Sequence, residues 1–488
     1  MSATAILHTR TVRHLGPRNL EDHVAKNITF PRTLCKDASR TLFLTLLAVC
    51  LSVRIVHWCI GRPKLYPDSS EYQAVALSIE TWDFHSYTGE RTPVYPLFLL
   101  LCGPDTQRVW ILQSILGIMS SFLLFRIVLL QTRDPIMGFL AGLAHGLSLN
   151  VLFFEAAILT ETFSAFCLIL CLFLLLRNLK SDREGWIAYA FIGIVAGMAA
   201  LVRPLFLYLP FLIGFILLFH WRIRRSPLRR VTVYLSAFFL PPIILLGGWS
   251  TFNKAAVDYF GTTTLLGYNL MQHAGKMMEE APQEYAAVRE IFIRYRKNNI
   301  DLAGSTTFTV FDARQQMMLA THTSVAGLSK ILTGLALRLI AEHPIVYARS
   351  VFEAWRSFWS VPMYWDRYGI FPMKAGRILE TLWGWEKEII SVLRLAFLII
   401  VMARAFLVLR VRQALNRIDI ESASWILAAV VLIGSIVQAC FESGENARYS
   451  LPFQSLIIAY VVIAAAPYLP GVHRADGEPR HESSPAQL

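Results

Sequence analysis

The stretch that decides the fold is residues 41–72, TLFLTLLAVCLSVRIVHWCIGRPKLYPDSSEY. Its first half is apolar and about 20 residues long, enough for a helix to cross the hydrocarbon core of a bilayer. Backbone groups in lipid must be satisfied internally, and this run lacks the alternation of a barrel strand, so we predict a transmembrane helix. The acidic motif Tyr66-Pro67-Asp68-Ser69-Ser70-Glu71-Tyr72 follows directly and is therefore expected just outside the membrane.

Apolar runs of similar length recur along the chain of 488 residues, which is 55% hydrophobic and only 16% charged. A soluble protein of this length would carry more charge. We therefore expect an all-α polytopic membrane protein with about ten transmembrane helices. The expected spans are 41–60, 107–130, 136–152, one ending near 176, 186–202, 205–220, 231–250, 389–409, 423–440 and 451–466.

Basic residues cluster in the segments between these runs, and they indicate the topology. The first 40 residues, the loops that follow residues 176 and 220, and the loop with Arg410, Arg412 and Arg417 are the basic ones, so we place them in the cytoplasm. The formal net charge of +12 is explained by these signals. Nucleic-acid binding is not indicated, since no basic and aromatic groove or motif is present. The seven cysteines lie mostly in or beside apolar runs, which is typical of core residues.

This topology divides the chain into five parts. We expect a cytoplasmic basic tail (1–40), an N-terminal transmembrane catalytic module (41–250) whose first outer loop is 61–104, an extracytoplasmic, mostly helical domain (251–388), C-terminal transmembrane helices (389–466) and a disordered tail (467–488). Apolar residues at helical spacing in 327–360 predict an amphipathic helix on the membrane surface, broken at Pro344. An ordinary amphipathic core helix is the alternative.

The polar residues that stand out all fall near the outer ends of the expected spans. Charges with unrelated structural roles would be expected on both sides of the membrane. We therefore predict one extracytoplasmic site. These polar residues are Asp68, Arg91, Glu155, Glu161, Arg203, Glu445, Asn446 and Arg448.

Asp68 has a catalytic and a structural interpretation. As a general base, or as a metal ligand, it would activate an acceptor hydroxyl. As part of Asp68-x-x-Glu71 it would instead cap a short helix near 68–81. The two roles do not exclude each other.

Glu155 and Glu161 compete for a place in the same site. They are six residues apart, so on a regular helix they would point about 240° apart and could not face one pocket. We favour Glu161, expected one to two turns inside the fourth span, where an unpaired charge is more costly. The alternative for Glu161 is a buried ion pair with an arginine.

Arg91 and Arg203 lie next to prolines at span ends. Guanidinium groups suit the clamping of a phosphate, and anchoring at the membrane interface is the alternative. The segment Glu445-Asn446-Ala447-Arg448-Tyr449 could instead cap the last span.

No HExxH or CxxC motif supports metal binding. A metal held by Asp68 and Glu161 alone would be carboxylate-rich, hence Mg²⁺ or Mn²⁺ sooner than Zn²⁺.

Several short motifs, in this order and on this side of the membrane, resemble those of the GT-C glycosyltransferases. They are the first outer loop with Asp68, Gly89-x-Arg91-x-Pro93-x-Tyr95-Pro96, Leu159-Thr160-Glu161-Thr162, Leu201-Val202-Arg203-Pro204 and Glu445-Asn446-Ala447-Arg448-Tyr449. The nearest branch is the bacterial dolichyl-phosphate-mannose-protein mannosyltransferase-like one, to which the lipid A aminoarabinose transferases are related. The resemblance covers roughly residues 41–466. The family often has adjacent acids in its first loop, whereas Ser69 follows Asp68 here.

The resemblance implies a glycosyltransferase of the cell envelope in the bacterial inner (plasma) membrane, with its site facing outside. It would move a monosaccharide from a polyprenyl-phosphate donor to a lipid, glycan or protein acceptor, with inversion. Asp68, Glu161 and Glu155 are the expected catalytic residues, and Arg91, Arg203 and Arg448 the expected phosphate ligands. Tyr72, Tyr95, Glu445 and Asn446 complete the expected site. The alternatives are a transporter or flippase of envelope precursors, expected to show internal repeats, and a non-catalytic assembly scaffold.

Overall fold

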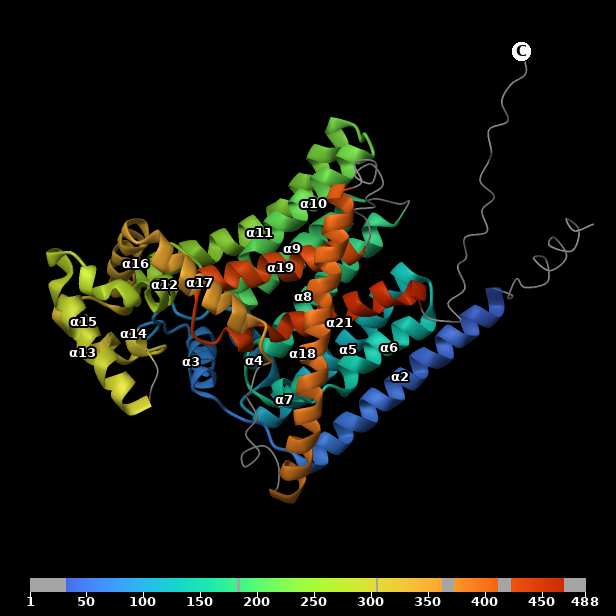
Figure 1. Ribbon diagram of the computed structural model, residues 1–488, viewed down its shortest axis with the longest axis horizontal. Coiled ribbons are helices and arrows are strands. Elements are labelled where there is room, and N and C mark those ends of the chain that lie inside the picture. The colour runs from blue at the N-terminus through green and yellow to red at the C-terminus, as the bar shows by residue number, and fades with distance from the viewer. Residues whose placement is uncertain (1–31, 182–184, 304–305, 362–372, 411–422, 469–488) are drawn as a thin grey trace, which may run out of the picture.

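The computed structural model describes residues 32–181, 185–303, 306–361, 373–410 and 423–468, and the regular structure in these ranges is helical (Figure 1). The only pairing of extended segments there is an isolated parallel bridge between Lys64 and Ala157. The all-α fold predicted from the sequence is confirmed. Most of the expected N-terminal tail, Arg412 and Arg417 of the expected inner loop, and the C-terminal tail from residue 469 lie outside the described residues.

Helices fill both halves of the chain. The first half contains α2 (Arg32–Ile60), α3 (Pro67–Thr81), α4 (Val94–Cys102), α5 (Thr106–Thr132), α6 (Pro135–Leu147), α7 (Leu149–Ala156), α8 (Glu161–Leu179), α9 (Trp186–Val202), η1 (Pro204–Tyr208), α10 (Leu209–Ile223) and α11 (Leu228–Val257). The second half contains α12 (Leu266–Ala274), η2 (Gly275–Glu280), η3 (Gln283–Tyr285), α13 (Ala286–Ala303), α14 (Thr309–Asp312), α15 (Arg314–Thr321), α16 (Val325–Glu342), α17 (Pro344–Phe358), α18 (Met373–Arg410), α19 (Ala423–Phe441), α20 (Asn446–Tyr449), α21 (Leu451–Ala465) and η5 (Ala466–Tyr468).

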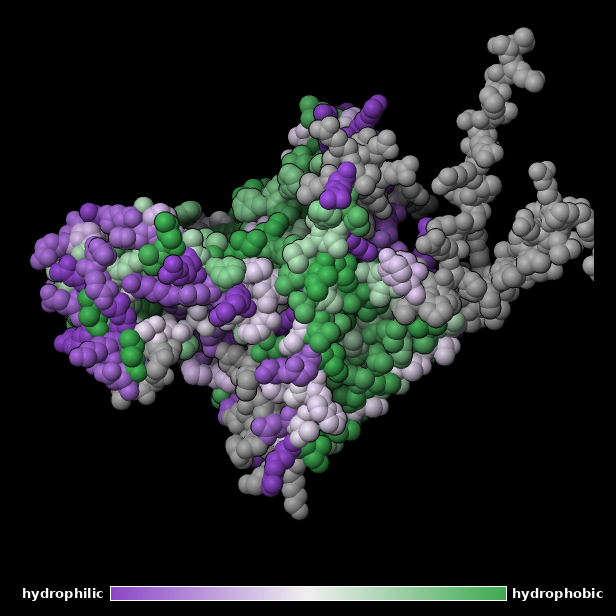
Figure 2. Space-filling view, viewed as in Figure 1, coloured by the Kyte–Doolittle hydropathy of each residue, from purple (hydrophilic) through white to green (hydrophobic). Residues whose placement is uncertain are grey.

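The chain is a multi-pass integral membrane protein. Within the described ranges, eight helices are long and apolar enough to cross a membrane, or up to ten if each bent pair of helices is one span. One such pair is α6 and α7, which meet at 49° and together cover the expected third span. Figure 2 shows an apolar surface over the helical bundle around α18, and a polar surface over helices α12 to α16 at the other end of the molecule.

The fourth span begins later than the sequence suggested. The segment between α7 and α8 is extended because its backbone pairs with residue 64: the Lys64 amide donates to the Ala156 carbonyl (2.8 Å), and the Ile158 amide donates to the Lys64 carbonyl (3.0 Å). Glu161 is therefore the first residue of α8, and its expected position one to two turns inside the span is wrong.

The described residues of 264–342, from Thr264 just before α12 to the end of α16, form a compact helical unit with its own apolar core. Leu328, Leu332 and Leu335 of α16 are fully buried in that core, so α16 follows the core-helix alternative. The next helix, α17, begins at Pro344 as expected and leaves Ile345 77% and Phe352 61% exposed. An apolar exposed face of this kind is typical of a helix at a membrane surface.

Candidate active site

The start of α3 fixes the position of Asp68. The Tyr66 amide donates to the Ser69 hydroxyl oxygen (2.9 Å), and the buried Ser69 hydroxyl donates to the Ile158 carbonyl (2.8 Å). Tyr66 is thus the N-cap residue, and Asp68 lies in the first helical turn after Pro67. The N-cap alternative for Asp68 is wrong, and its carboxylate is available to partners outside the helix.

Two arginines bind the Asp68 carboxylate. Arg91 Nη2 donates to one oxygen and Arg448 Nη1 to the other, both at 2.9 Å. Burial acts to raise the pKa of Asp68, but the two guanidinium groups outweigh burial and hold this pKa below its usual value. The side chain remains 30% exposed, so a ligand can reach it from outside the protein.

Glu161 shares one of these arginines. Its Oε1 accepts from Arg448 Nε and from Arg203 Nη2, the latter at 3.3 Å, and its side chain is fully buried. The structure therefore places Glu161 in the buried ion pair that was its structural alternative. Because Arg448 also binds Asp68, the two predicted acids belong to one network of hydrogen bonds.

Arg91 makes two further contacts in the first loop. Its Nε donates to Glu71 (2.7 Å), and its guanidinium lies 4.8 Å from the centre of the Tyr72 ring and within 3.3 Å of the Tyr72 hydroxyl. Glu71 was not among the predicted site residues. Its spacing of three from Asp68 is the signal that could have found it, since residues at i and i+3 share one helix face.

Arg203 has an unused hydrogen-bond donor. Its guanidinium stacks 4.1 Å above the Tyr449 ring, and Nη2 points at Glu161. Its Nη1 is buried and makes no hydrogen bond to any described residue. A buried donor without a partner is unfavourable, so this atom is suited to an anionic ligand.

The remaining predicted residues surround this network. Glu445 binds Arg448 Nη1 at 2.8 Å. Tyr95 is one layer deeper: its ring packs 5.0 Å from that of Tyr72 and its hydroxyl donates to Gln113 (3.0 Å). Asn446 donates its side-chain amide to the Glu442 carbonyl (3.0 Å) and so holds the loop around Arg448.

Glu155 does not join the network. Its Oε1 accepts from Arg54 Nη2 at 2.6 Å, and both side chains are fully buried. The carboxylate fits beside α5 because residue 117 is glycine, where any Cβ would collide with it. The structure thus separates Glu155 from the other predicted catalytic acids. Arg54 was missed, although a lone arginine inside an apolar run is a signal for a buried partner.

The arrangement does not fit a divalent cation. Asp68 and Glu161 each accept from two guanidinium groups, which repel a cation and occupy both oxygens of Asp68 and Oε1 of Glu161. The described part of the chain also holds no group of three or more His, Cys, Asp or Glu residues suited to a metal ion.

The helical unit holds both loops that carry network arginines. The Thr264 amide donates to the Gly89 carbonyl (2.9 Å), and Arg314 pairs with Glu90 (2.6 Å), next to Arg91. On the second loop, Gln272 of α12 accepts from the amides of residues 443 and 444 (2.8 and 3.0 Å), just before Arg448.

Part of this chain is similar to a known protein family. Residues 94–249, which include Glu161 and Arg203, match the family model described as dolichyl-phosphate-mannose-protein mannosyltransferase. Among curated proteins, none matches this chain. The chain is similar to the crystal structure of ArnT from Cupriavidus metallidurans in the apo state, with 14% identity, a TM-score of 0.34, and 86% of this chain and 79% of that one covered. It is also similar to the structure of ArnT bound to undecaprenyl phosphate, with 11% identity, a TM-score of 0.32, and 89% and 79% covered. The match over residues 94–249 confirms the resemblance, predicted from the sequence, to the dolichyl-phosphate-mannose-protein mannosyltransferase family.

Proposed function

We propose that this protein is a membrane glycosyltransferase that moves a monosaccharide from a polyprenyl-phosphate donor to a hydroxyl of a lipid, glycan or protein acceptor. One observation carries the proposal: Asp68, Glu161, Arg91, Arg203 and Arg448, from distant parts of the chain, form one network. The donor class follows the description of the matched family, which names a dolichyl-phosphate sugar. The positions of the basic loops support an extracytoplasmic location for this network.

The arginines are suited to hold the phosphate of the donor. Arg203 Nη1 is a free buried donor, and Arg91 and Arg448 point at the part-exposed Asp68. Planar guanidinium groups bind phosphate oxygens through paired hydrogen bonds. They also stabilise the negative charge that develops on the phosphate as the glycosidic bond breaks.

Asp68 is the proposed general base. In the free protein the two arginines hold its pKa below the usual range, which makes it a weak base. A bound phosphate competes with Asp68 for the guanidinium groups of Arg91 and Arg448, and its negative charge offsets theirs. Donor binding therefore raises the pKa of Asp68 and makes it a stronger base. The base then becomes effective only when the donor is in place.

The proposed step is a single displacement with inversion. The acceptor oxygen attacks the anomeric carbon on the face opposite the phosphate, while Asp68 takes the hydroxyl proton. The bond between the anomeric carbon and the phosphate oxygen breaks, and its electron pair stays on that oxygen. Polyprenyl phosphate is the leaving group, and the arginines bind its negative charge. Positioning and electrostatic stabilisation supply most of the rate.

Asp68→Asn tests the proposal in the purified full chain with a labelled polyprenyl-phosphate sugar. We expect transfer to fall by at least ~10²-fold, the usual contribution of a general base, while the protein remains folded. Asp83→Asn is the matched control, because Asp83 is exposed and accepts only the His85 amide (3.0 Å) among the hydrogen bonds resolved here. Full activity of a folded Asp68→Asn variant would remove the base assignment. A wild-type protein that moves the intact donor across vesicles without cleaving it would favour the transporter alternative.

A further inference from the structure

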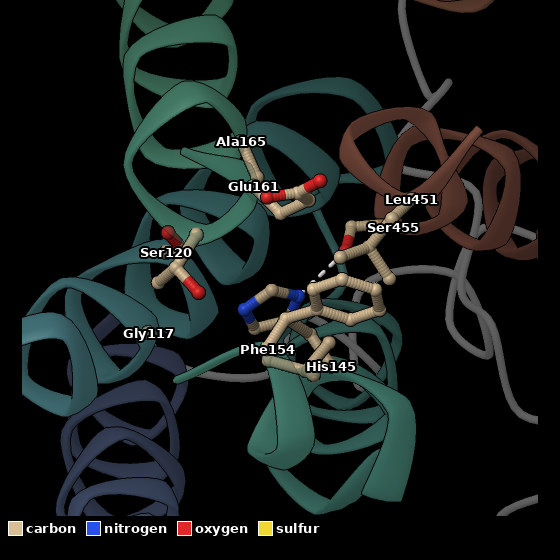
Figure 3. A pocket seen from close by; sticks show the side chains of 10 residues that line it. Gly117, Ser120, His145, Phe154, Glu161, Ala165, Leu451 and Ser455 are labelled. Carbon is tan, nitrogen blue, oxygen red and sulfur yellow. Dashed lines mark hydrogen bonds between the residues drawn. The ribbon is translucent and has the colours of Figure 1, made fainter. Parts of the chain in front are cut away.

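A small cavity lies directly behind the arginine network, where α8 faces α5, α6 and α21. Glu161 and Thr162 of α8 line one side of the cavity, and His145 of α6 and Ser120 of α5 line the other. Figure 3 shows Glu161 and His145 facing each other across this space, with His145 bonded to Ser455. The network arginines use Glu161 Oε1, which leaves Oε2 for the cavity.

Three residues that line this cavity carry buried polar atoms with unused hydrogen-bonding capacity. Glu161 Oε2, Thr162 Oγ1 and His145 Nε2 are buried and have no hydrogen-bond partner among the described residues. A buried polar atom that stays unsatisfied is unfavourable. Three of them around one cavity therefore indicate a polar ligand that serves all three.

Size and charge identify the ligand. The space open to the centre of a water molecule is about 10 Å³, close to the ~10–15 Å³ that one buried water needs. A metal cation is disfavoured because Glu161 already faces two guanidinium groups, those of Arg203 and Arg448. A neutral water adds no charge and can both accept and donate hydrogen bonds.

The donors and acceptors around the cavity match one water. The Ser455 hydroxyl lies 2.5 Å from His145 Nδ1. When this hydroxyl donates to Nδ1, the histidine proton is on Nε2 and points into the cavity. A water there accepts from His145 Nε2 and from Thr162 Oγ1, and it donates to Glu161 Oε2. Its second proton can go to Ser120 Oγ, whose own proton is given to the Leu116 carbonyl (2.9 Å).

We propose that this cavity binds a single water molecule through which His145 positions Glu161. The water fixes Oε2, so Oε1 is presented to Arg203 and Arg448 in one orientation. His145 is then a positioning residue for the phosphate clamp, a role that rests on the proposed function. The water site itself does not depend on that function.

The water is tested by a high-resolution structure of the full chain and of Ala165→Val. Ala165 lines the cavity, so the added methyl groups fill it and leave every polar partner in place. We expect density for one water between Glu161 and His145 in the wild type and none in Ala165→Val. A wild-type cavity without density, or a direct bond between His145 and Glu161, would overturn the proposal.

The positioning role is tested by binding of undecaprenyl phosphate and by kinetics. His145→Phe removes a hydrogen bond worth about 1 kcal/mol, so we expect a roughly fivefold loss of affinity and a similar rise in the donor KM, with kcat nearly unchanged. His145→Gln should restore binding because its amide also donates. Ala165→Val should weaken binding alike, and its combination with His145→Phe should add nothing.

Cys167→Val is the control, since Cys167 is buried on the same helix but does not line the cavity. Unchanged binding by folded His145→Phe and Ala165→Val would overturn the positioning role. If the wild type binds undecaprenyl phosphate but transfers no sugar, the proposed function fails while the water and its effect on binding stand.

Discussion

At the scale of single residues, Arg448 connects the site. It binds Asp68, Glu161 and Glu445 with one side chain, so three carboxylates depend on one guanidinium group. Removal of one partner from a buried ion pair costs about 3–5 kcal/mol, because the other charge stays buried. In an Arg448 variant, a loss of stability could not be distinguished from a loss of phosphate binding. Arg203, which has only one ion pair among the described residues, is the better probe of phosphate binding.

Arg203→Lys should weaken donor binding without unfolding the protein. Lysine keeps the positive charge near Glu161, but it lacks the second nitrogen that is free in the arginine. The loss of a charged hydrogen bond worth about 1.5–3 kcal/mol should raise the donor KM by roughly 10- to 100-fold. Kinetics with varied donor concentration measure this change. Arg108→Lys, at an exposed arginine, should leave KM unaltered, and equal KM values for both variants would contradict the role of Arg203.

Glu442 should make stability depend on pH. Burial raises its pKa to about 7, although the amides of Gly444 and Glu445 donate to it and oppose this shift. The folded protein then holds a proton that the unfolded chain has released above its ordinary pKa of 4.5. Stability from this residue is therefore full below about pH 4.5 and falls as the pH rises to about 7, by about 3 kcal/mol at most.

Glu442→Gln tests this pH dependence. It imitates the protonated form and should remove the decline between pH 5 and 7. The difference in Tm between variant and wild type, measured from pH 5 to 8, cancels the other titrating groups. A difference that stays constant over this range would show that Glu442 does not hold the extra proton.

At the scale of elements, the site depends on breaks between helices. The extended segment between α7 and α8 pairs with residue 64 and accepts a hydrogen bond from Ser69. These contacts bring the first turn of α3, with Asp68, beside the first turn of α8, with Glu161. Both acids are thus at helix N-termini, where the helix dipole favours negative charge. The spans of the bundle also pack closely against one another.

The contact between α9 and α11 shows how close that packing is. A Cβ at Gly193 would collide with the Phe238 carbonyl, whereas a Cβ at Gly247 meets nothing within 4 Å. Both glycines are helical, so alanine favours the helix by up to ~1 kcal/mol at each site. Gly193→Ala should nevertheless destabilise the protein by about 1–3 kcal/mol through overpacking.

Gly247→Ala is the matched control and should be neutral or slightly stabilising. Thermal unfolding of both variants in the same detergent makes the comparison. If both variants raise Tm equally, α9 and α11 do not pack as closely as the structure indicates.

At the scale of the whole molecule, the helical unit and the membrane bundle meet at the site. The unit binds the loop before Arg91 through Thr264 and Arg314, and the loop before Arg448 through Gln272. Two of the three network arginines are therefore positioned by a part of the chain that is not in the bundle (Figure 1). A substitution at this junction should therefore lower the activity even though the substituted residue is not part of the site.

Arg314→Met should lower transfer roughly tenfold with the fold retained. The change leaves Glu90 buried and unpaired next to Arg91, at a cost of about 1–3 kcal/mol that loosens the loop. Adding Glu90→Gln removes the unpaired charge and should recover part of the activity. Arg338→Met, in an exposed pair of the same unit, should have no effect because surface ion pairs contribute little. Equal activity of the Arg314→Met and Arg338→Met variants would show that the junction does not affect the site.

The sequence by itself determined the helical membrane fold, the approximate spans and the set of candidate charges. These follow from hydrophobic run length and from the cost of charge near lipid, which are local properties of the chain. Partner choice was decided only by tertiary structure. Asp68 and Arg448 are 380 positions apart and form a pair, while Glu155, six residues from Glu161, turns to Arg54 instead. The break that starts α8 at Glu161, and the contacts of Ser69 and His145, likewise depend on packing between distant segments, which periodicity along the chain does not encode.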